Sequence, residues 1–178
     1  MPVVALPELE RLVAADRAAG HTVGFANGVF DLLHVGHVRY LEASGAEADR
    51  LIVAVNDDRS VAGLKGEGRP ILPAADRAEL VAALRGVDYV VVFGDATVER
   101  LLLLLKPDVH CKGTDYTVDT VPERGVVAGY GGRTVIVGDS KSHATRELLA
   151  RIARTEDQGP TTDDQRLTTK SDSDKAPR

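Results

Sequence analysis

The sequence predicts an α/β fold: a single Rossmann-like domain built on a doubly wound, parallel, five-stranded sheet. Short runs of β-branched residues alternate along the chain with segments of helical periodicity, the order that covers a parallel sheet with helices on both faces. All but one of these runs are almost continuously apolar at their centres, as in strands that are buried on both faces. A length of 178 residues allows one such domain with short additions.

The expected elements follow in βα order after an N-terminal helix over Pro7–Ala19, which lies within residues 1–20. The expected strands are Thr22–Ala26, Arg50–Val55, Asp88–Phe93, Asp108–Lys112 and Arg133–Val137. The fourth strand is the exception to the apolar pattern because His110 interrupts it. The further expected helices are Val35–Ala48, Ala74–Leu84, Thr97–Leu105, Pro122–Gly129 and His143–Ile152. A longer link around Ala62–Pro73 precedes the helix at Ala74.

The composition of the chain changes near Thr155. From there to the end, Leu167 is the one large apolar residue among Asp, Thr, Ser, Lys and Pro, so this segment cannot bury enough surface to offset its ordering entropy. We expect a disordered polar tail over 155–178 and a working domain over 21–154. Ligands of such a domain are expected beyond the carboxyl ends of its strands, where open sheets bind them.

Composition and charge exclude several classes of protein. Hydrophobic residues make up 43% and charged residues 28%, which fits a globular core and excludes collagen, a coiled coil and global disorder. A net charge of −5 favours neither nucleic acid nor an acidic membrane surface as a partner, and no apolar run approaches the roughly 18 residues of a membrane span. The single cysteine, Cys111, can form no internal disulfide, so we expect a soluble cytoplasmic protein.

The first expected strand leads directly into the segment Asn27–His37, which reads NGVFDLLHVGH and opens the next helix. Gly28 lets the backbone turn tightly, and Gly36 lets a ligand approach the start of the helix. His34 and His37 flank that start, where unpaired N–H groups and the positive end of the helix dipole favour a phosphate. The segment is therefore predicted to clamp a polyphosphate.

Two other interpretations apply to these histidines. A lone histidine is more often exposed or part of a core, but two of them, three residues apart at a glycine-containing strand-to-helix junction, favour phosphate binding. A metal pair is the second alternative, yet neither a third histidine nor an acid has ligand-like spacing within the helix. Neither a Walker A loop nor a Gly-x-Gly-x-x-Gly fingerprint occurs at this turn. We predict no protein-held metal site.

With these residues in view, the chain resembles the nucleotidylyltransferases that carry a His-x-Gly-His signature, here His34-Val35-Gly36-His37. Within them it is similar to the heptose 1-phosphate adenylyltransferases, which form the transferase half of bifunctional heptose kinase/adenylyltransferases. The matching segments occur in the right order: Asn27–Asp31, Leu51–Asp58, Leu64–Gly66, Arg69–Ile71 and Lys112–Tyr116. No segment resembles the kinase half, so we expect a separate kinase to make the heptose phosphate.

The resemblance implies that a sugar 1-phosphate oxygen attacks the α-phosphorus of ATP, with diphosphate as the leaving group. Catalysis then rests on positioning and charge stabilisation by His34, His37 and Lys65, the last acting from a mobile loop. Implied nucleotide contacts are Asn27, Gly28, Phe30, Asp31, Gly36, Lys112, Gly113, Asp115 and Thr145. Weaker candidates for the sugar phosphate are Asn56, Arg69, Arg77, Tyr116 and Arg146. Mg²⁺ is expected to arrive with ATP, held by phosphates and water, and the family suggests a homodimer or larger homo-oligomer.

Several of these residues also have plain structural interpretations. Lys65 fits a solvated loop equally well, and Arg69 and Arg77 fit surface charges. Asp31 is either an acid that orients a histidine or Mg²⁺-bound water, or a turn-forming or helix-capping acid. The turn at Gly113 and Asp115 needs these residue types whether or not it binds a ligand. These alternatives stay open on the sequence alone.

The chain departs from the family before its last expected helix. There the family carries Ser-Thr-Thr, whose hydroxyl and N–H groups hold nucleotide phosphates, whereas this chain reads His143-Ala144-Thr145-Arg146. Thr145 keeps one hydroxyl, and Arg146 is either a phosphate-binding cation or a charge on the helix surface. Two rival functions stay open. One is a cytidylyltransferase that uses CTP on glycerol 3-phosphate, another small phosphate or a heptose phosphate, and the other is a nucleotide-binding module with weakened catalysis.

Overall fold

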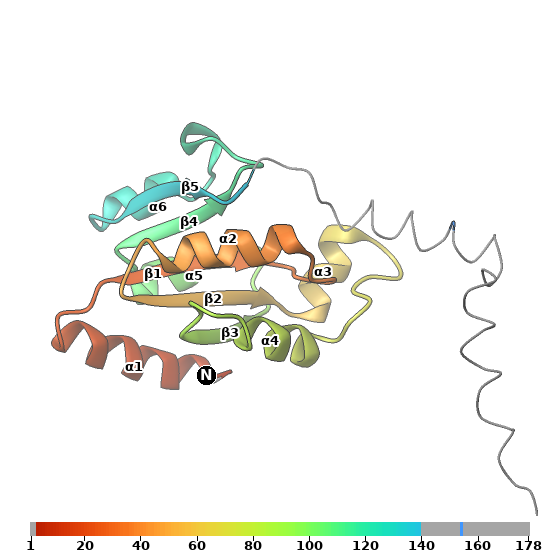
Figure 1. Cartoon of the computed structure of the whole chain (residues 1–178), viewed down its shortest axis with the longest axis horizontal. Helices are drawn as coiled ribbons and strands as arrows, with labels where there is room; N and C mark the ends of the chain where they lie inside the picture. The colour runs from red at the N-terminus through yellow and green to blue at the C-terminus, as the bar shows by residue number, and fades with distance from the viewer. Residues whose placement is uncertain (1–2, 140–153, 155–178) are drawn as a thin grey trace, which may run out of the picture. The chain divides into compact units, whose positions relative to one another are not determined.

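The structure is a computed structural model that describes residues 3–139 and residue 154 (Figure 1). The chain divides into two compact units, residues 1–143 and 144–178, and of the second unit only residue 154 is described. The expected helix His143–Ile152, the expected tail over 155–178 and the candidates Thr145 and Arg146 all lie outside the described residues.

A five-stranded sheet in the order β3-β2-β1-β4-β5 forms the centre of the first unit, and every neighbouring pair is parallel. The strands are β1 (Val23–Gly28), β2 (Arg50–Asn56), β3 (Tyr89–Phe93), β4 (Val109–Gly113) and β5 (Arg133–Val137). The chain adds strands on one side of β1 and then crosses to the other side at β4. Open sheets form a ligand crevice at such a switch point, outside the carboxyl ends of the strands. The predicted fold class is confirmed.

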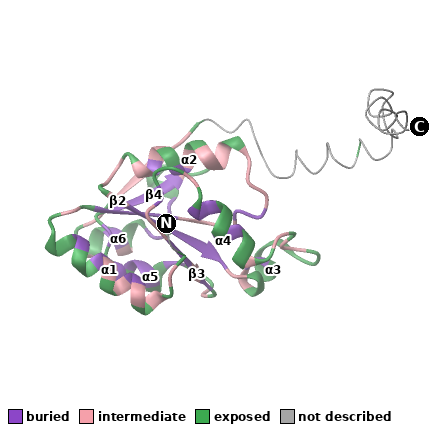
Figure 2. Ribbon diagram, turned by 60° about the horizontal axis from the view of Figure 1, so that its bottom comes forward, coloured by how far each residue is buried: buried purple, intermediate pink, exposed green. Residues whose placement is uncertain are grey.

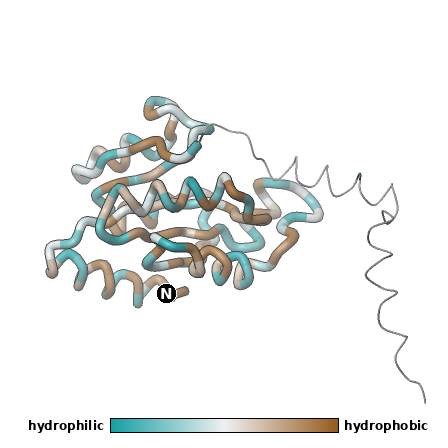
Figure 3. Tube along the Cα trace, in the orientation of Figure 1, coloured by the Kyte–Doolittle hydropathy of each residue, from teal (hydrophilic) through white to brown (hydrophobic). Residues whose placement is uncertain are grey.

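Helices cover both faces of the sheet. One face carries α1 (Leu6–Ala18), α5 (Glu99–Leu105) and α6 (Arg124–Gly129), whose apolar side chains form one buried core with Phe25 and Ile52. The other face carries α2 (Val35–Gly45) and α4 (Ala74–Ala82), whose side chains form a second core with Val53 and Val90. The strands β1 to β4 are buried along most of their length (Figure 2), whereas β5 is mostly half-buried, and hydrophobic stretches occur in both strands and helices (Figure 3).

The predicted link around Ala62–Pro73 is partly wrong, because the structure contains the helix α3 (Asp58–Lys65) there. The Asp57 carboxylate caps this helix by accepting a hydrogen bond from the Ser60 N–H over 2.7 Å. Gly66 ends it with a φ of 89°. Only Val61 of the helix is buried, so α3 packs little against the core. Lys65 is therefore the last residue of a helix and not a loop residue.

Smaller departures concern the ends of elements. β1 and β4 each extend to a glycine of the candidate site, Gly28 and Gly113. A short 3-10 helix, η1 (Val118–Thr120), follows β4 and was not predicted. No helix among the described residues has both the length and the apolar character needed to cross a membrane.

Candidate active site

The turn between β1 and α2 is shaped by a glycine and by a residue in the left-handed region. Phe30 has a φ of 50°, which is uncommon for a bulky side chain, and its ring is 2% exposed. A Cβ atom at Gly28 would lie 3.0 Å from two atoms of that ring, so the position has little room for a side chain. Phe30 was a candidate nucleotide contact, but its buried ring instead supports the turn that leads to the histidines.

The two histidines of the signature form a stacked pair at the start of α2. Their ring centroids are 3.8 Å apart with an interplanar angle of 21°, and the Phe30 ring makes an edge contact with His37 at 5.3 Å. His34 is the N-cap of α2, and its N–H lies 3.4 Å from Nδ1 of His37. Gly36 is the second residue of the helix. The structure thus brings both histidines to the helix end where phosphate binding is favourable.

His37 is uncharged at neutral pH in the free protein. Burial and, to a smaller extent, the neighbouring His34 lower its pKa to about 4, against an opposing backbone hydrogen bond with Leu32. A neutral imidazole still donates one N–H to a ligand. A phosphate beside the ring would favour its protonated form and strengthen the hydrogen bond.

Asp31, in the histidine motif, binds the segment that follows α3. Its carboxylate pairs with Arg69 at 2.5 Å and accepts backbone hydrogen bonds from Ile71 at 2.6 Å and Leu72 at 3.1 Å. Burial raises the pKa of this carboxyl, but the bonds from Arg69 and from the two backbone N–H groups outweigh it and hold the pKa below its usual range. These contacts favour the turn-forming interpretation of Asp31. One guanidinium nitrogen of Arg69 is already bonded to this carboxylate.

Arg77 is fully buried and serves a structural role. Its guanidinium donates to the carbonyl oxygens of Leu72 at 2.9 Å and Val29 at 2.5 Å, and to the Asp58 carboxylate at 2.7 Å. The alternative interpretation as a surface charge is therefore wrong. The guanidinium also faces carbonyl oxygens rather than solvent, so the geometry gives no support to Arg77 as a substrate contact.

A buried polar cluster lies at the switch point between β1 and β4. Lys112 Nζ lies 3.0 Å from Oδ1 of Asn27 and 3.4 Å from Oε2 of Glu123, and His110 Nε2 lies 3.4 Å from the same Asn27 oxygen. Tyr116 places its ring 5.5 Å from the Lys112 ammonium. Burial lowers the pKa of Lys112, and Glu123 opposes that shift. Sequence reasoning selected Asn27, Lys112 and Tyr116 but missed the role of His110 and Glu123.

The remaining candidates lie at the expected end of the sheet without forming one contact network. Asn56 ends β2, is buried, and donates to the Ser60 hydroxyl at 3.2 Å. Lys65 is exposed at the end of α3. Asp115 is exposed in the turn after β4, where the N–H of Tyr116 bonds the Gly113 carbonyl. Within residues 3–139 and 154, no three His, Cys, Asp or Glu side chains are gathered as metal ligands.

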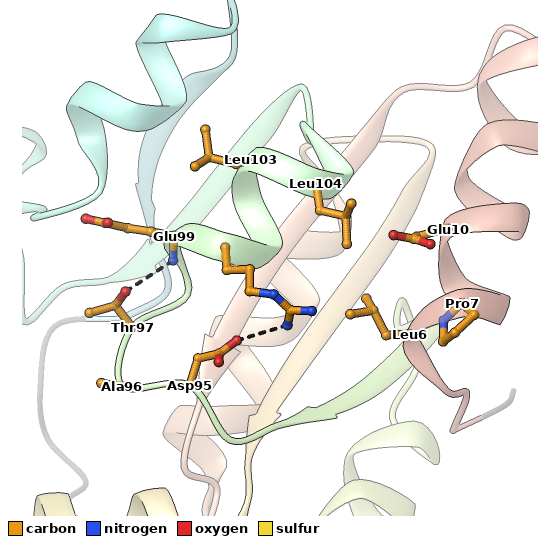
Figure 4. Close-up of a pocket in the computed structure, with 10 residues that line it drawn as sticks. Leu6, Pro7, Glu10, Asp95, Ala96, Thr97, Glu99, Leu103 and Leu104 are labelled. Carbon is orange, nitrogen blue, oxygen red and sulfur yellow. Dashed lines mark hydrogen bonds and ion pairs between the residues drawn. The ribbon is translucent and has the colours of Figure 1, made fainter.

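One pocket of the described part of the chain lies elsewhere, between α1 and α5 (Figure 4). Leu6, Pro7 and Glu10 line it from α1, and Leu103 and Leu104 line it from α5. Its lining includes none of the residues predicted from the sequence. Because it adjoins neither the histidine motif nor the β1–β4 switch point, we place the candidate active site on chemistry and topology and not on this pocket.

Comparison with known proteins finds similar sequences over most of the chain. A family model described as cytidylyltransferase-like matches residues 25–166, which include the histidine motif and the switch-point strands. The bifunctional protein HldE of Pseudomonas fluorescens strain SBW25 is 47% identical over 147 residues, and that of Pseudomonas putida strain F1 is 46% identical over 145 residues. These alignments cover 82% and 80% of this chain but 31% of each relative. The chain thus spans about a third of the length of these relatives.

A solved structure also resembles this chain. The lipopolysaccharide core biosynthesis protein from Thermoplasma volcanium GSS1 superposes with a TM-score of 0.59 at 29% identity. The match covers 68% of this chain and all of that one.

Proposed function

Because this chain belongs to the cytidylyltransferase-like family, we propose that its nucleotidyl transfer reaction moves AMP from ATP to D-glycero-D-manno-heptose 1-phosphate and forms ADP-heptose. The observation that carries this proposal is the stacked pair His34 and His37 at the start of α2, next to the β1–β4 switch point. The similarity to HldE proteins supports heptose phosphate as the acceptor and ATP as the donor.

In the proposed reaction, an oxygen of the sugar phosphate forms a bond to the α-phosphorus of ATP. The bond from that phosphorus to the oxygen shared with the β-phosphate breaks, and diphosphate leaves with the electron pair. No protein nucleophile takes part. The protein aligns the two substrates and stabilises the charge that develops on the leaving group.

The histidines are proposed to donate hydrogen bonds to the β- and γ-phosphates and to the bridging oxygen. Their stacking restricts the rotation of each ring, so the rings lose little further rotational freedom when ATP binds. The N–H groups at the start of α2 add dipoles of the right sign. Lys65, at the exposed end of α3, is proposed to supply a cation from a neighbouring element.

Mg²⁺ is proposed to enter as part of the MgATP substrate. Phosphate oxygens and water are proposed to hold the ion, since Mg²⁺ that binds with a nucleotide keeps several waters and few protein ligands. We further propose a homodimer or larger assembly in the cytoplasm. The exposed Leu103 and Leu104 of α5 support an apolar contact between copies, and sedimentation velocity tests it.

CTP is the second candidate donor, because the matching family model is described as cytidylyltransferase-like. The deciding experiment incubates the protein with Mg²⁺, heptose 1-phosphate and each of ATP, CTP, GTP and UTP, and measures released diphosphate. Release with ATP alone supports the adenylyltransferase, and release with CTP alone supports the second candidate. Nucleotide binding without diphosphate from any of the four indicates a binding module instead.

The histidine assignment has its own matched control. Replacing His34 or His37 by Ala is expected to lower turnover by about 10²- to 10³-fold while the protein stays folded. His21→Ala provides the control, because His21 precedes β1 at the opposite end of the sheet and contacts Asp16. Near wild-type diphosphate release by the His34 and His37 variants would contradict the catalytic role of these histidines.

A further inference from the structure

The orientation of the Asn27 side-chain amide is fixed by its neighbours. A lysine ammonium has only hydrogen-bond donors, so the Asn27 atom 3.0 Å from Lys112 Nζ must be the amide oxygen. His110 bonds the same oxygen through Nε2, which must then carry the proton. His110 is fully buried with its other ring nitrogen unpartnered, as expected for a neutral imidazole.

The same network leaves the amide nitrogen of Asn27 available. With its oxygen turned toward Lys112, the NH₂ group turns away from β4. It donates to no group of the described part of the chain, and Asn27 is only half-buried. Asn27 is the residue before Gly28, at the carboxyl end of β1, so these two N–H donors belong to the edge of the sheet where open sheets bind ligands.

Lys112 is itself committed to protein groups. Glu123 pairs with it from the N-cap of α6, and the two side chains are 8% and 10% exposed. The Lys112 ammonium donates a second hydrogen bond to Asn27, and the ring of Tyr116 lies over the ammonium. Such a buried ammonium has little freedom to reach a ligand, and Glu123 cancels most of its charge.

We propose, on the basis of the nucleotidyl transfer proposed above, that Asn27 binds a phosphoryl oxygen of a substrate through its amide N–H groups, and that Lys112 and Glu123 position this amide rather than bind phosphate. His110 assists by holding the same oxygen. The phosphoryl oxygen belongs either to the nucleotide or to the sugar phosphate, and the two share the same acceptor chemistry. Asn27 is the substrate contact, and the three buried residues are positioning residues.

The first test replaces Asn27 by Asp, which keeps the shape and the bond to Lys112 but removes both donors and adds a negative charge. Binding of MgATP alone and of heptose 1-phosphate alone is measured by calorimetry. We expect the Kd of one of the two to rise at least about tenfold, which identifies the source of the phosphoryl oxygen. Unchanged Kd values for both ligands overturn the proposal. The wild type is measured with the same two ligands: if it binds neither, the proposed function fails, whereas binding by the wild type that the Asn27 variant retains in full shows that the Asn27 assignment fails.

The second test uses Glu123→Gln and follows ligand affinity from pH 6 to pH 9. Without Glu123, no group opposes the effect of burial on Lys112, whose other close neighbours are Asn27, His110 and Tyr116. A neutral amine accepts as well as donates, so it no longer fixes the Asn27 amide. We expect Kd to rise with pH in this variant and not in the wild type. Asp119→Asn is the control, since Asp119 is an exposed acid in the same segment that pairs with Arg124.

Two further outcomes keep the proposal falsifiable. If Lys112 is a phosphate ligand, removal of the opposing charge in Glu123→Gln strengthens binding, which overturns the positioning role. If that variant fails to fold, the double variant Lys112→Met with Glu123→Leu replaces the buried pair by apolar groups, a change that proteins often tolerate. We expect it to unfold at a similar urea concentration and to bind the Asn27-dependent ligand about tenfold more weakly at every pH. Wild-type affinity in the folded double variant contradicts the proposal.

Discussion

Arg77, on α4, donates a hydrogen bond of 2.5 Å to the carbonyl oxygen of Val29, in the turn that precedes the histidine pair. The same guanidinium bonds Asp58 at the start of α3. One buried side chain thus joins the β1–α2 turn to the helix that ends at Lys65. The two parts of the proposed active site are therefore joined by a residue whose guanidinium is bonded to protein groups.

Replacing Arg77 by Met is expected to destabilise the fold by about 3 kcal/mol or more. The change leaves two carbonyl oxygens without their donor in a buried place, and each such loss costs about 1–3 kcal/mol. Urea unfolding measures the free energy. Arg100→Met is the control, because its exposed pair with Asp95 is worth at most about 1 kcal/mol. Equal stability of the two variants contradicts the structural role of Arg77.

The sheet could be predicted from the sequence because its strands are apolar on both faces. In an alternating βα order, a short run that is apolar on both faces indicates a buried strand. All five strands were predicted to within two residues of their observed ends. The helix α3 was missed because it is short and buries only Val61, although Asp57 and Gly66 mark its two ends. Its signal was the acid three residues before Ser60 and the closing glycine.

The site was predictable where the chemistry is local and not where it depends on distant partners. His34 and His37 lie three residues apart on one helix, so their meeting follows from the sequence. The partners of Arg77 and the pairing of Lys112 with Glu123 depend on crossovers between elements. An arginine or glutamate in a helical pattern gives no sign of which carbonyl or ammonium it will meet.

Gly28 and Gly63 give a matched pair of glycine substitutions. Gly28→Ala forces a methyl group to within 3.0 Å of the Phe30 ring, which must shift the turn that carries the histidines. We expect turnover to fall at least about tenfold, because displacing catalytic groups by a fraction of an ångström weakens positioning. Gly63→Ala meets no atom within 4 Å and lies inside α3, so it should stabilise the protein by up to about 1 kcal/mol without loss of turnover.

The stability of the protein is expected to fall as pH is lowered from 6.5 toward 4. Burial, helped by the charge of a neighbour, lowers the pKa of His37 to about 4 and that of His110 to about 3; the neighbours are His34 and Lys112. Between those values and about 6.5 the unfolded chain binds more protons than the folded one, so the free energy of unfolding rises with pH. Each histidine contributes about 1.4 kcal/mol per pH unit in this window.

His110→Gln tests this dependence. Gln keeps a donor for Asn27 and does not titrate, so the slope of stability between pH 4.5 and 5.5 should decrease by about 1.4 kcal/mol per pH unit. Carboxyl groups with a lowered pKa, among them Glu8, Asp16 and Asp31, also lose their contribution as pH falls, but the variant keeps all of them. The difference in slope between the variant and the wild type therefore isolates His110. A slope equal to that of the wild type would mean that His110 is protonated in the folded protein.

Lys65 is expected to be needed for turnover and not for folding. Three exposed residues, 66–68, separate it from Arg69, which pairs with Asp31 of the histidine motif. The start of α3 is held by Arg77 through Asp58, so both ends of the segment around Lys65 are attached to the same site. Lys65→Met should lower kcat by about 10²- to 10³-fold, as loss of a transition-state contact does. The free energy of unfolding should change by less than about 0.5 kcal/mol, because the side chain is exposed.

Arg59→Met removes another exposed cation from the same helix and should leave kcat within about twofold of the wild type. If both variants lose activity equally, the general positive charge of α3 matters and Lys65 has no specific role.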